Sequence, residues 1–188
     1  MARTRDEAAR LRVLQSARDL VCRLGPRAVT VDQIAAEAEV GKQTIYRWWP
    51  SKSAVILDAL SELTDPVPAE LPDSTYEALQ VQMRRVARMF TSRNGELIRE
   101  LVADAQGDLA LAEDFRCRFF AHRRAHGGET LAKGIASGEL RPDLNVEDAL
   151  DLLYAPLWLR LLIGHLPTSQ AAADRLLDLA WPALVNRT

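Results

Sequence analysis

The chain has 188 residues, of which 48% are hydrophobic and 27% charged, the balance of one or two ordinary globular domains. No apolar run reaches the roughly 18 residues that a membrane span needs, and the N-terminus has charges without the apolar core of a signal peptide. We therefore expect a cytoplasmic protein with no membrane partner. The net charge divides unevenly, because residues 1–52 carry ten Lys/Arg against six Asp/Glu while the rest carries fourteen against twenty. The basic N-terminal part indicates a polyanionic partner.

The first 64 residues are expected to form a helical domain. Apolar stripes at spacings of three and four predict helices over about 6–24, from Thr30 onward, over 42–49, and from Ser51 onward. Gly25 and Pro26 would end the first of these. Thr30 and Gln33 have the spacing of a capping box, which predicts the start of the second.

The stretch DPVPAELPDS at 65–74 has three prolines and no periodicity, so it is the expected linker between domain 1–64 and domain 75–188. Strand patterns are almost absent. In the second domain, Gly127 and Gly128 indicate either a kink or a helix boundary, and the expected helices cover about 74–92, 95–106, 109–137, 146–165 and 168–186. The sequence thus predicts an all-α protein of about nine helices.

The short helices on either side of Val40-Gly41 have the helix-turn-helix arrangement, whose second helix enters the major groove of DNA. At 3.6 residues per turn, Ile45 and Trp49 share one face and are the expected inward pair. Tyr46 and Trp48 lie at the flanks, where a ring can pack and still donate to a phosphate. Composition alone leaves two alternatives open: a solvated cap on a helical bundle, or a helix-turn-helix that contacts protein.

The order of residues in TVDQIAAEAEVGKQTIYRWWPSKSAVILDAL goes further, because it resembles the DNA-binding domain of TetR-type (TetR/AcrR) bacterial transcriptional regulators over about residues 8–62. The matching positions are Thr30, Ile34, Ala35, Ala38, Val40, Thr44, Ile45, Tyr46, Ser51, Lys52 and Val55. The resemblance implies a three-helix helix-turn-helix domain with its recognition helix at about 42–49. It also implies a C-terminal helical bundle that binds an effector and dimerises, and the function of a ligand-responsive repressor on a near-palindromic DNA operator.

Carried over by position, the resemblance implies roles for particular side chains at the DNA. Phosphate contacts are expected from Thr30, Tyr46 and Lys52. Base or near-base contacts are expected from Lys42, Gln43, Thr44 and Arg47, and Trp48 adds a contact from the flank. Arg3 and Arg5 are expected to reach DNA from an N-terminal arm that is disordered without it.

The chain also departs from the usual family pattern. Gly41 stands where a capping Ser is usual, which predicts a weaker cap on the recognition helix. Gln43 takes a position that is often Gly and is a candidate for pairing with adenine. Asp32 lies near the expected DNA-facing start of the second helix, where it either reads a cytosine or points away.

The helix over 146–165 is apolar nearly all round, so we expect it to be buried on both sides, once by its own domain and once by a second subunit. The resemblance implies a two-fold dimer through this helix and the last one. The expected interface residues are Leu150, Leu153, Leu157, Leu161, Leu176, Leu179, Ala180 and Ala183. Two core helices of a monomer are the alternative.

The implied pocket for a small-molecule effector lies among the C-terminal helices. Its candidates, each of which could equally be a core residue, are Met83, Phe90, Phe115, Phe119, His122, Tyr154 and Trp158. No cofactor, metal or catalytic residue is expected. A rival interpretation is a metal-binding or enzymatic bundle that uses His122 and His126, with Cys117 and Glu129 nearby. Otherwise Cys22 and Cys117 are expected to be reduced, buried thiols.

Overall fold

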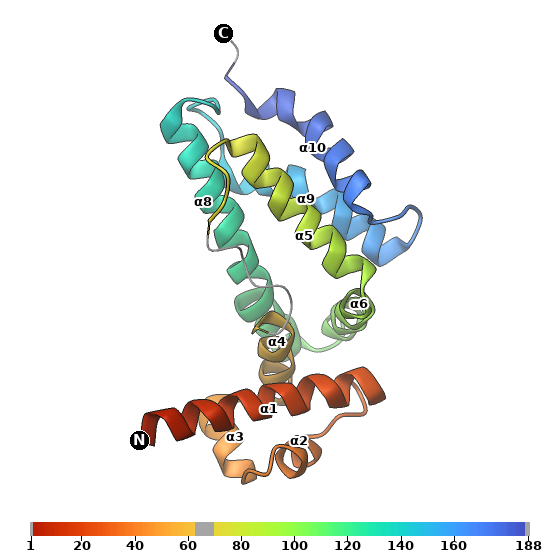
Figure 1. Cartoon of the computed structure of the whole chain (residues 1–188). Helices are drawn as coiled ribbons and strands as arrows, with labels where there is room; N and C mark the ends of the chain where they lie inside the picture. The colour runs from red at the N-terminus through yellow and green to blue at the C-terminus, as the bar shows by residue number, and fades with distance from the viewer. Residues whose placement is uncertain (1, 63–69, 187–188) are drawn as a thin grey trace. The chain divides into compact units, whose positions relative to one another are not determined.

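The computed structural model describes residues 2–62 and 70–186, and the side chains of 6–61 and 70–186 (Figure 1). This part of the chain forms ten α-helices and one π-helical segment, and one isolated antiparallel bridge joins Leu140 to Val185. The predicted all-α class is confirmed. Among the described residues, no helix has both the length and the hydropathy to cross a membrane.

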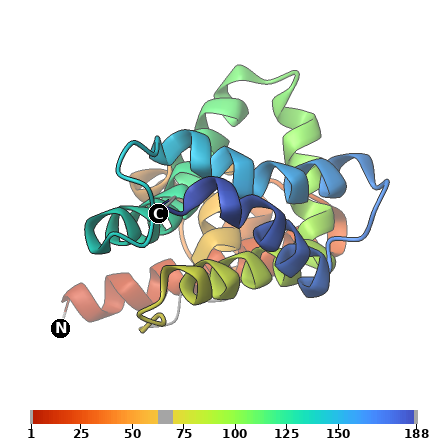
Figure 2. The same ribbon diagram turned by 90° about the horizontal axis from the view of Figure 1, so that it is seen from above.

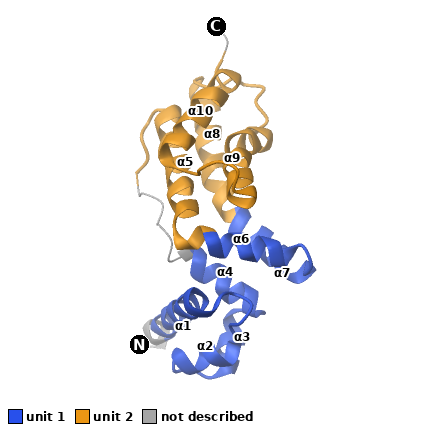
Figure 3. Ribbon diagram, turned by 90° about the vertical axis from the view of Figure 1, so that its right-hand side faces the viewer, with its two compact units in different colours: residues 1–66, 96–121 blue, residues 67–95, 122–188 orange. Residues whose placement is uncertain are grey.

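Two compact units divide the chain (Figure 3). Unit 1 takes residues 1–66 and 96–121, and unit 2 takes residues 67–95 and 122–188. This division differs from the expected domains, because residues 96–121 return to the N-terminal unit. Of the expected linker, residues 65–69 lie outside the described part of the chain.

Unit 1 is built around α1 (Ala2–Leu24) and α4 (Lys52–Glu62), which pack on each other. The stripe of α1 is buried as expected, with Val13, Leu14 and Ala17 fully enclosed. The helix ends where predicted, since Gly25 takes a left-handed φ of 79° and its N–H bonds back to Val21. Its start differs from the expected disordered arm, because α1 begins at Ala2. The remaining elements are α2 (Val31–Glu37), α3 (Lys42–Trp48), most of α6 (Arg93–Ala105), α7 (Leu109–Asp114) and η1 (Phe115–Phe120).

The turn between α2 and α3 is set by local hydrogen bonds. The amides of Glu39 and Val40 bond to the carbonyls of Ala36 and Ala35, which is the Schellman pattern that ends a helix. Glu39 therefore has a left-handed φ of 54°, a conformation that glycine takes at lower cost. Sequence reasoning missed this strain, since the residue before Val40 has no turn character of its own.

Unit 2 is a bundle of α5 (Thr75–Thr91), α8 (Ala121–Ser137), α9 (Val146–Ile163) and α10 (Gln170–Leu184). Figures 1 and 2 both show α10 beside α5, and Arg84 of α5 holds Asp174 of α10 through hydrogen bonds of 2.7 and 2.9 Å. Asn145 caps the start of α9, and Gly164, with a φ of 70°, ends it. The long expected helix over 109–137 is instead divided into α7, η1 and α8.

Gly127 and Gly128 do not interrupt α8, which runs from Ala121 to Ser137, so of the two alternatives, a kink or a helix boundary, the boundary is wrong. The close packing of α8 on α9 explains the glycine at position 127. A Cβ atom there would lie 2.7 Å from Cδ2 of Leu150, which is closer than packed carbon atoms approach. Glycine at this position thus lets α8 lie directly against α9.

Candidate nucleic-acid interface

The inward face of α3 is held as the sequence predicts. Ile45 is fully buried and Trp49 is 2% exposed, and the Trp49 indole N–H donates to a carboxylate oxygen of Asp58 at 2.7 Å. Asp58 lies on α4, so this bond ties the end of the short helix to the central helix of unit 1. In Figure 1, α2 and α3 lie together along one side of α1. The expected inward pair is confirmed.

The outward face of α3 presents polar and aromatic tips. Tyr46 is 48% exposed, Lys42, Gln43 and Arg47 are exposed, and Thr44 is half-buried. The half-buried Trp48 lies between two partners: the Arg47 guanidinium is 5.1 Å from its ring centre, and the Trp49 ring meets it edge-on at 5.6 Å. This stack orders the last turn of α3, because the buried Trp49 fixes Trp48, which in turn positions Arg47.

Two carboxylates share this surface with the cations. Lys42 Nζ lies 2.9 Å from Asp32, and Arg47 lies 3.0 Å from Asp6 of α1. The hydrogen bond and the negative charge of Asp32 raise the pKa of the Lys42 ammonium. Asp32 thus pairs with the neighbouring lysine, which the sequence did not predict, and its two expected roles at DNA stay predictions. Asp6 was not foreseen, because it lies 41 positions from Arg47 in the chain.

The expected phosphate ligands outside α3, Thr30 and Lys52, already make hydrogen bonds within unit 1. The predicted capping box is confirmed: the Thr30 hydroxyl accepts from the Gln33 amide, and the Gln33 side chain accepts from the Thr30 amide at 2.8 Å. Lys52 Nζ donates to the carbonyls of Pro26 and Arg27, at 3.1 and 3.4 Å, which leaves one ammonium proton for a phosphate. Gly41 caps α3 without a side-chain bond, as expected. The side chains of Arg3 and Arg5 lie outside the described residues.

The expected effector residues fall in two groups. Met83 and Phe90 of α5, His122 of α8, and Tyr154 and Trp158 of α9 belong to unit 2, where the rings of Phe90 and Trp158 meet edge-on at 4.8 Å. Phe115 and Phe119 belong to η1 of unit 1, where their rings stack on each other at 5.1 Å. Phe119 and Met83 are fully buried.

The expected dimer residues also divide, and most need correction. Leu150, Leu153, Leu157 and Leu161 are at most 6% exposed, because this stripe of α9 faces the core of its own unit, and Ala180 of α10 is buried as well. These side chains are not available to a second chain. Leu179 and Ala183 are exposed and Leu176 is half-buried. The exposed large apolar residues of α9 are Leu152, Leu159, Leu162 and Ile163.

The histidines and cysteines of the rival interpretation do not form a ligand cluster. The rings of His122 and His126 meet at 5.1 Å, but within residues 2–62 and 70–186 no group of three or more His, Cys, Asp or Glu is placed to hold a metal ion. Cys22 is half-buried, and Cys117 is exposed rather than buried. The Cys117 thiol donates to Glu113 at 3.0 Å, which raises the pKa of the thiol.

Comparison with known proteins places these observations in a family. Residues 13–59 match the family described as bacterial regulatory proteins, tetR family, and residues 72–180 match the tetracyclin repressor-like C-terminal domain. The HTH-type transcriptional regulator YdeS of Bacillus subtilis (strain 168) is 45% identical over 162 residues, which cover 86% of this chain and 82% of YdeS.

Solved structures agree. The TetR family transcription regulator SCO0332 has a TM-score of 0.77 and 30% identity, over 95% of this chain and 99% of that one. FadR from Bacillus subtilis, solved in complex with stearoyl-CoA, shares the fold with a TM-score of 0.64 and 17% identity, over 90% of this chain and 96% of that one. The chain belongs to the TetR family of DNA-binding transcriptional regulators.

Proposed function

We propose that this chain is a homodimeric repressor that binds a near-palindromic operator through α3 and leaves it when a small-molecule effector binds unit 2. The observation that carries the proposal is the division of α3 by face. Ile45 and Trp49 hold the helix to unit 1, while Gln43, Tyr46 and Arg47 project from it. Because the proposed target is DNA, we expect the protein to work in the cytoplasm.

In this proposal each exposed side chain of α3 has a chemical task. The Gln43 amide donates to N7 and accepts from N6 of an adenine, a pair of bonds that no other base offers. Tyr46 and Lys52 donate to phosphate oxygens, which fixes the register of the helix but carries no sequence information. Lys42 and Arg47 add positive charge at the DNA. To contact a phosphate or a base, they must leave their ion pairs with Asp32 and Asp6.

The dimer in this proposal uses the exposed apolar side chains of α9 and α10. Leu152, Leu159, Leu162 and Ile163 lie on α9, and Leu179, which is 79% exposed, lies on α10. Side chains of this size rarely gather on a surface that stays in water. A two-fold axis here would place two copies of α3 in successive major grooves, about 34–36 Å apart.

Release by an effector follows from that spacing, because a ligand that changes the distance between the two copies of α3 prevents both from docking at once. Support for a small-molecule site comes from FadR, which shares the fold and was solved with stearoyl-CoA. The chemistry of that ligand is not carried over, since the identity between the chains is only 17%.

The test is binding of the full-length protein to the intergenic DNA beside its own gene, measured at a series of salt concentrations. We expect affinity to fall steeply as salt rises, because each phosphate contact releases counterions. Tyr46→Ala should weaken binding to all fragments alike. Affinity that does not depend on salt, or Tyr46→Ala protein that binds as well as wild type, would refute the proposed DNA interface.

A further inference from the structure

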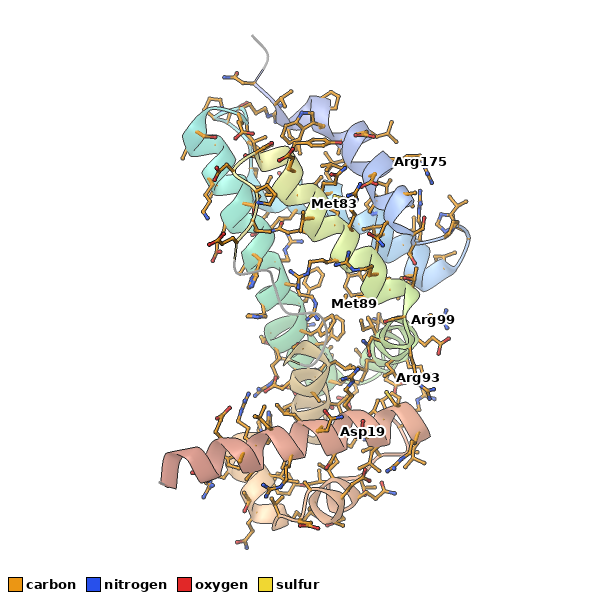
Figure 4. All side chains as sticks on the ribbon, viewed as in Figure 1. Asp19, Met83, Met89, Arg93, Arg99 and Arg175 are labelled. Atoms are coloured by element: carbon orange, nitrogen blue, oxygen red, sulfur yellow. The ribbon has the colours of Figure 1, made fainter. Side chains whose placement is uncertain are left out.

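Helices α5 and α8 of unit 2 exchange polar contacts across their shared side. The Gln82 side chain on α5 donates to the Thr130 hydroxyl at 2.9 Å and to the His126 carbonyl at 3.3 Å, both on α8. Towards the other end of this side, the Arg123 guanidinium lies 3.5 Å from the sulfur of Met89, which Figure 4 labels. Later residues of α5 thus face earlier residues of α8, so the two helices run in opposite directions.

Gln82 and His126 each have one buried side-chain atom without a partner. Gln82 is 6% exposed, and its Oε1 and the Nδ1 of His126 are the buried side-chain atoms without a hydrogen bond in the described part of the chain. The Gln82 orientation is fixed, because its amide nitrogen donates to two acceptors and only its oxygen is left over. A buried acceptor that lacks a donor costs folding free energy, so its presence calls for a ligand or another explanation.

The next turn of each helix carries a guanidinium group. Arg85 follows Gln82 by three positions on α5, and Arg123 precedes His126 by three positions on α8, so each shares a face with the unsatisfied residue of its helix. Burial, and secondly the charge of Arg85, lower the pKa of Arg123 to about 10. Arg123 therefore remains a cation at neutral pH, in a place where a second cation lies close.

Helix α9 adds a tyrosine near these residues of α5 and α8. On α9, the Tyr154 hydroxyl lies so close to α8 that a Cβ built on Gly127 would be 3.6 Å from it. Burial raises the pKa of Tyr154, and the charge of Arg85 acts on the same phenol in the opposite direction. Gln82, Arg85, Arg123, His126 and Tyr154, called the polar ring below, thus come from neighbouring turns of three helices, and two of them carry guanidinium groups.

We propose that this polar ring binds the head group of the effector, and that the effector is a small carboxylate that also carries a hydroxyl or a similar hydrogen-bond donor. The carboxylate lies between Arg85 and Arg123, and the hydroxyl donates to Gln82. In this proposal the apolar body of the effector extends towards Trp158, which follows Tyr154 by one turn and meets the Phe90 ring at 4.8 Å. This inference rests on the proposed function, since it gives the chemistry of the effector that the function requires.

The experiment uses the full-length protein without DNA and three probes, 3-hydroxybenzoate, 3-hydroxybenzamide and benzoate, with calorimetric titration as the readout. The hydroxy acid should bind about tenfold more tightly than its amide, because only the acid forms charge-assisted bonds with the guanidinium groups. It should also bind more tightly than benzoate, which offers no donor to Gln82. Equal affinity for acid and amide, equal affinity for the two acids, or no binding of the hydroxy acid at millimolar concentration would overturn the proposal.

Variants locate the site on the protein. Arg85→Met and Arg123→Met should each abolish the preference for acid over amide. Arg88→Met, which removes an exposed guanidinium from the same helix, should retain it. An acid preference that survives both ring variants contradicts the assignment, and the wild-type comparison stands even if one variant fails to fold. Because these titrations contain no DNA, their failure leaves operator binding to be judged by its own salt-dependent test.

Discussion

Helices α3 and α9 differ in how clearly their sequences distinguish an inward from an outward face. In α3 the polar and apolar residues alternate with helical period, so that periodicity alone assigns Ile45 and Trp49 to the core. In α9 nearly every side chain is apolar, and periodicity cannot distinguish the face that packs inside from the face that stays outside. In the structure Leu153 and Leu157 are fully buried, whereas Leu159 is 54% exposed, so the Leu153 face is the inner one.

The sequence of a helix indicates which face is buried only where polar and apolar residues occupy different faces. Where both faces are apolar, as in α9, the packing against neighbouring helices determines which face is buried. Gly127 leaves room for Leu150 on the surface of α8, and the Leu150 stripe is the face that packs inward. The apolar residues left outside then become the surface that a second copy can use.

The largest expected effect tests the inward face of α9. Leu157→Ala should lower the free energy of unfolding by about 2–5 kcal/mol, because it removes a fully enclosed side chain and leaves a cavity. Leu109→Ala, at a position that is 89% exposed, should stay within about 0.5 kcal/mol of wild type. Chemical denaturation at one fixed protein concentration measures both. A small loss for Leu157→Ala would mean that this face of α9 is not the core face.

The outward face of α9 is tested by a charge. Leu159→Lys should convert the dimer to monomer at micromolar concentration, since the interface would have to bury an unpaired ammonium in each chain. Sedimentation measures the change. Leu109→Lys is the matched control, because it places the same charge on an exposed leucine of unit 1. If wild type is already monomeric, or Leu159→Lys remains dimeric, the proposed interface is wrong.

The outward face of α3 is tested by base preference. Gln43→Ala should lose about 1–3 kcal/mol of discrimination at one base pair in each half-site and leave the other positions unchanged. Binding to a set of single-substituted operators provides the measurement. Loss of discrimination across several base pairs would instead show that Gln43 supports the orientation of the whole helix.

The smallest expected effect concerns the cap of α3. Gly41 has the extended backbone of a capping residue, and a Cβ there would meet its first neighbour, Thr44 Oγ1, at an ordinary 3.8 Å. Gly41→Ser should therefore raise the free energy of unfolding by a few tenths of a kcal/mol, as its hydroxyl accepts from a free amide of the first turn. Thermal unfolding provides the comparison with wild type, and a lower melting temperature for the variant would contradict this account of the cap.

Much of unit 1 could be predicted because its determinants are local. The capping box of Thr30 and Gln33 and the end of α1 at Gly25 each depend on residues within one turn of helix. The ion pairs Asp6–Arg47 and Asp32–Lys42 could not be predicted, because they join residues of different helices whose distance depends on packing. The left-handed Glu39 and the π-helical η1 were missed for a related reason, since neither carries a residue pattern that differs from an ordinary helix or turn.

In unit 2, the helices could be predicted but not the direction in which their side chains point. Aromatic and methionine residues were natural candidates for an effector pocket, yet within the described part of the chain the buried side-chain atoms without a hydrogen bond belong to Gln82 and His126. Neither atom is recognisable from sequence, because an unsatisfied hydrogen bond is a property of the folded surroundings. The polar ring depends on how α5, α8 and α9 pack together, which the periodicity of each single helix does not determine.

The central claim is that α3 reads DNA while the outward faces of α9 and α10 pair two copies of the chain. A footprint of the full-length protein on the intergenic DNA beside its gene tests both parts at once. The account predicts two protected half-sites related by a dyad, with centres about one helical turn, or 10 base pairs, or a multiple of it apart. Protection of a single half-site, or of two half-sites in direct repeat, would contradict it.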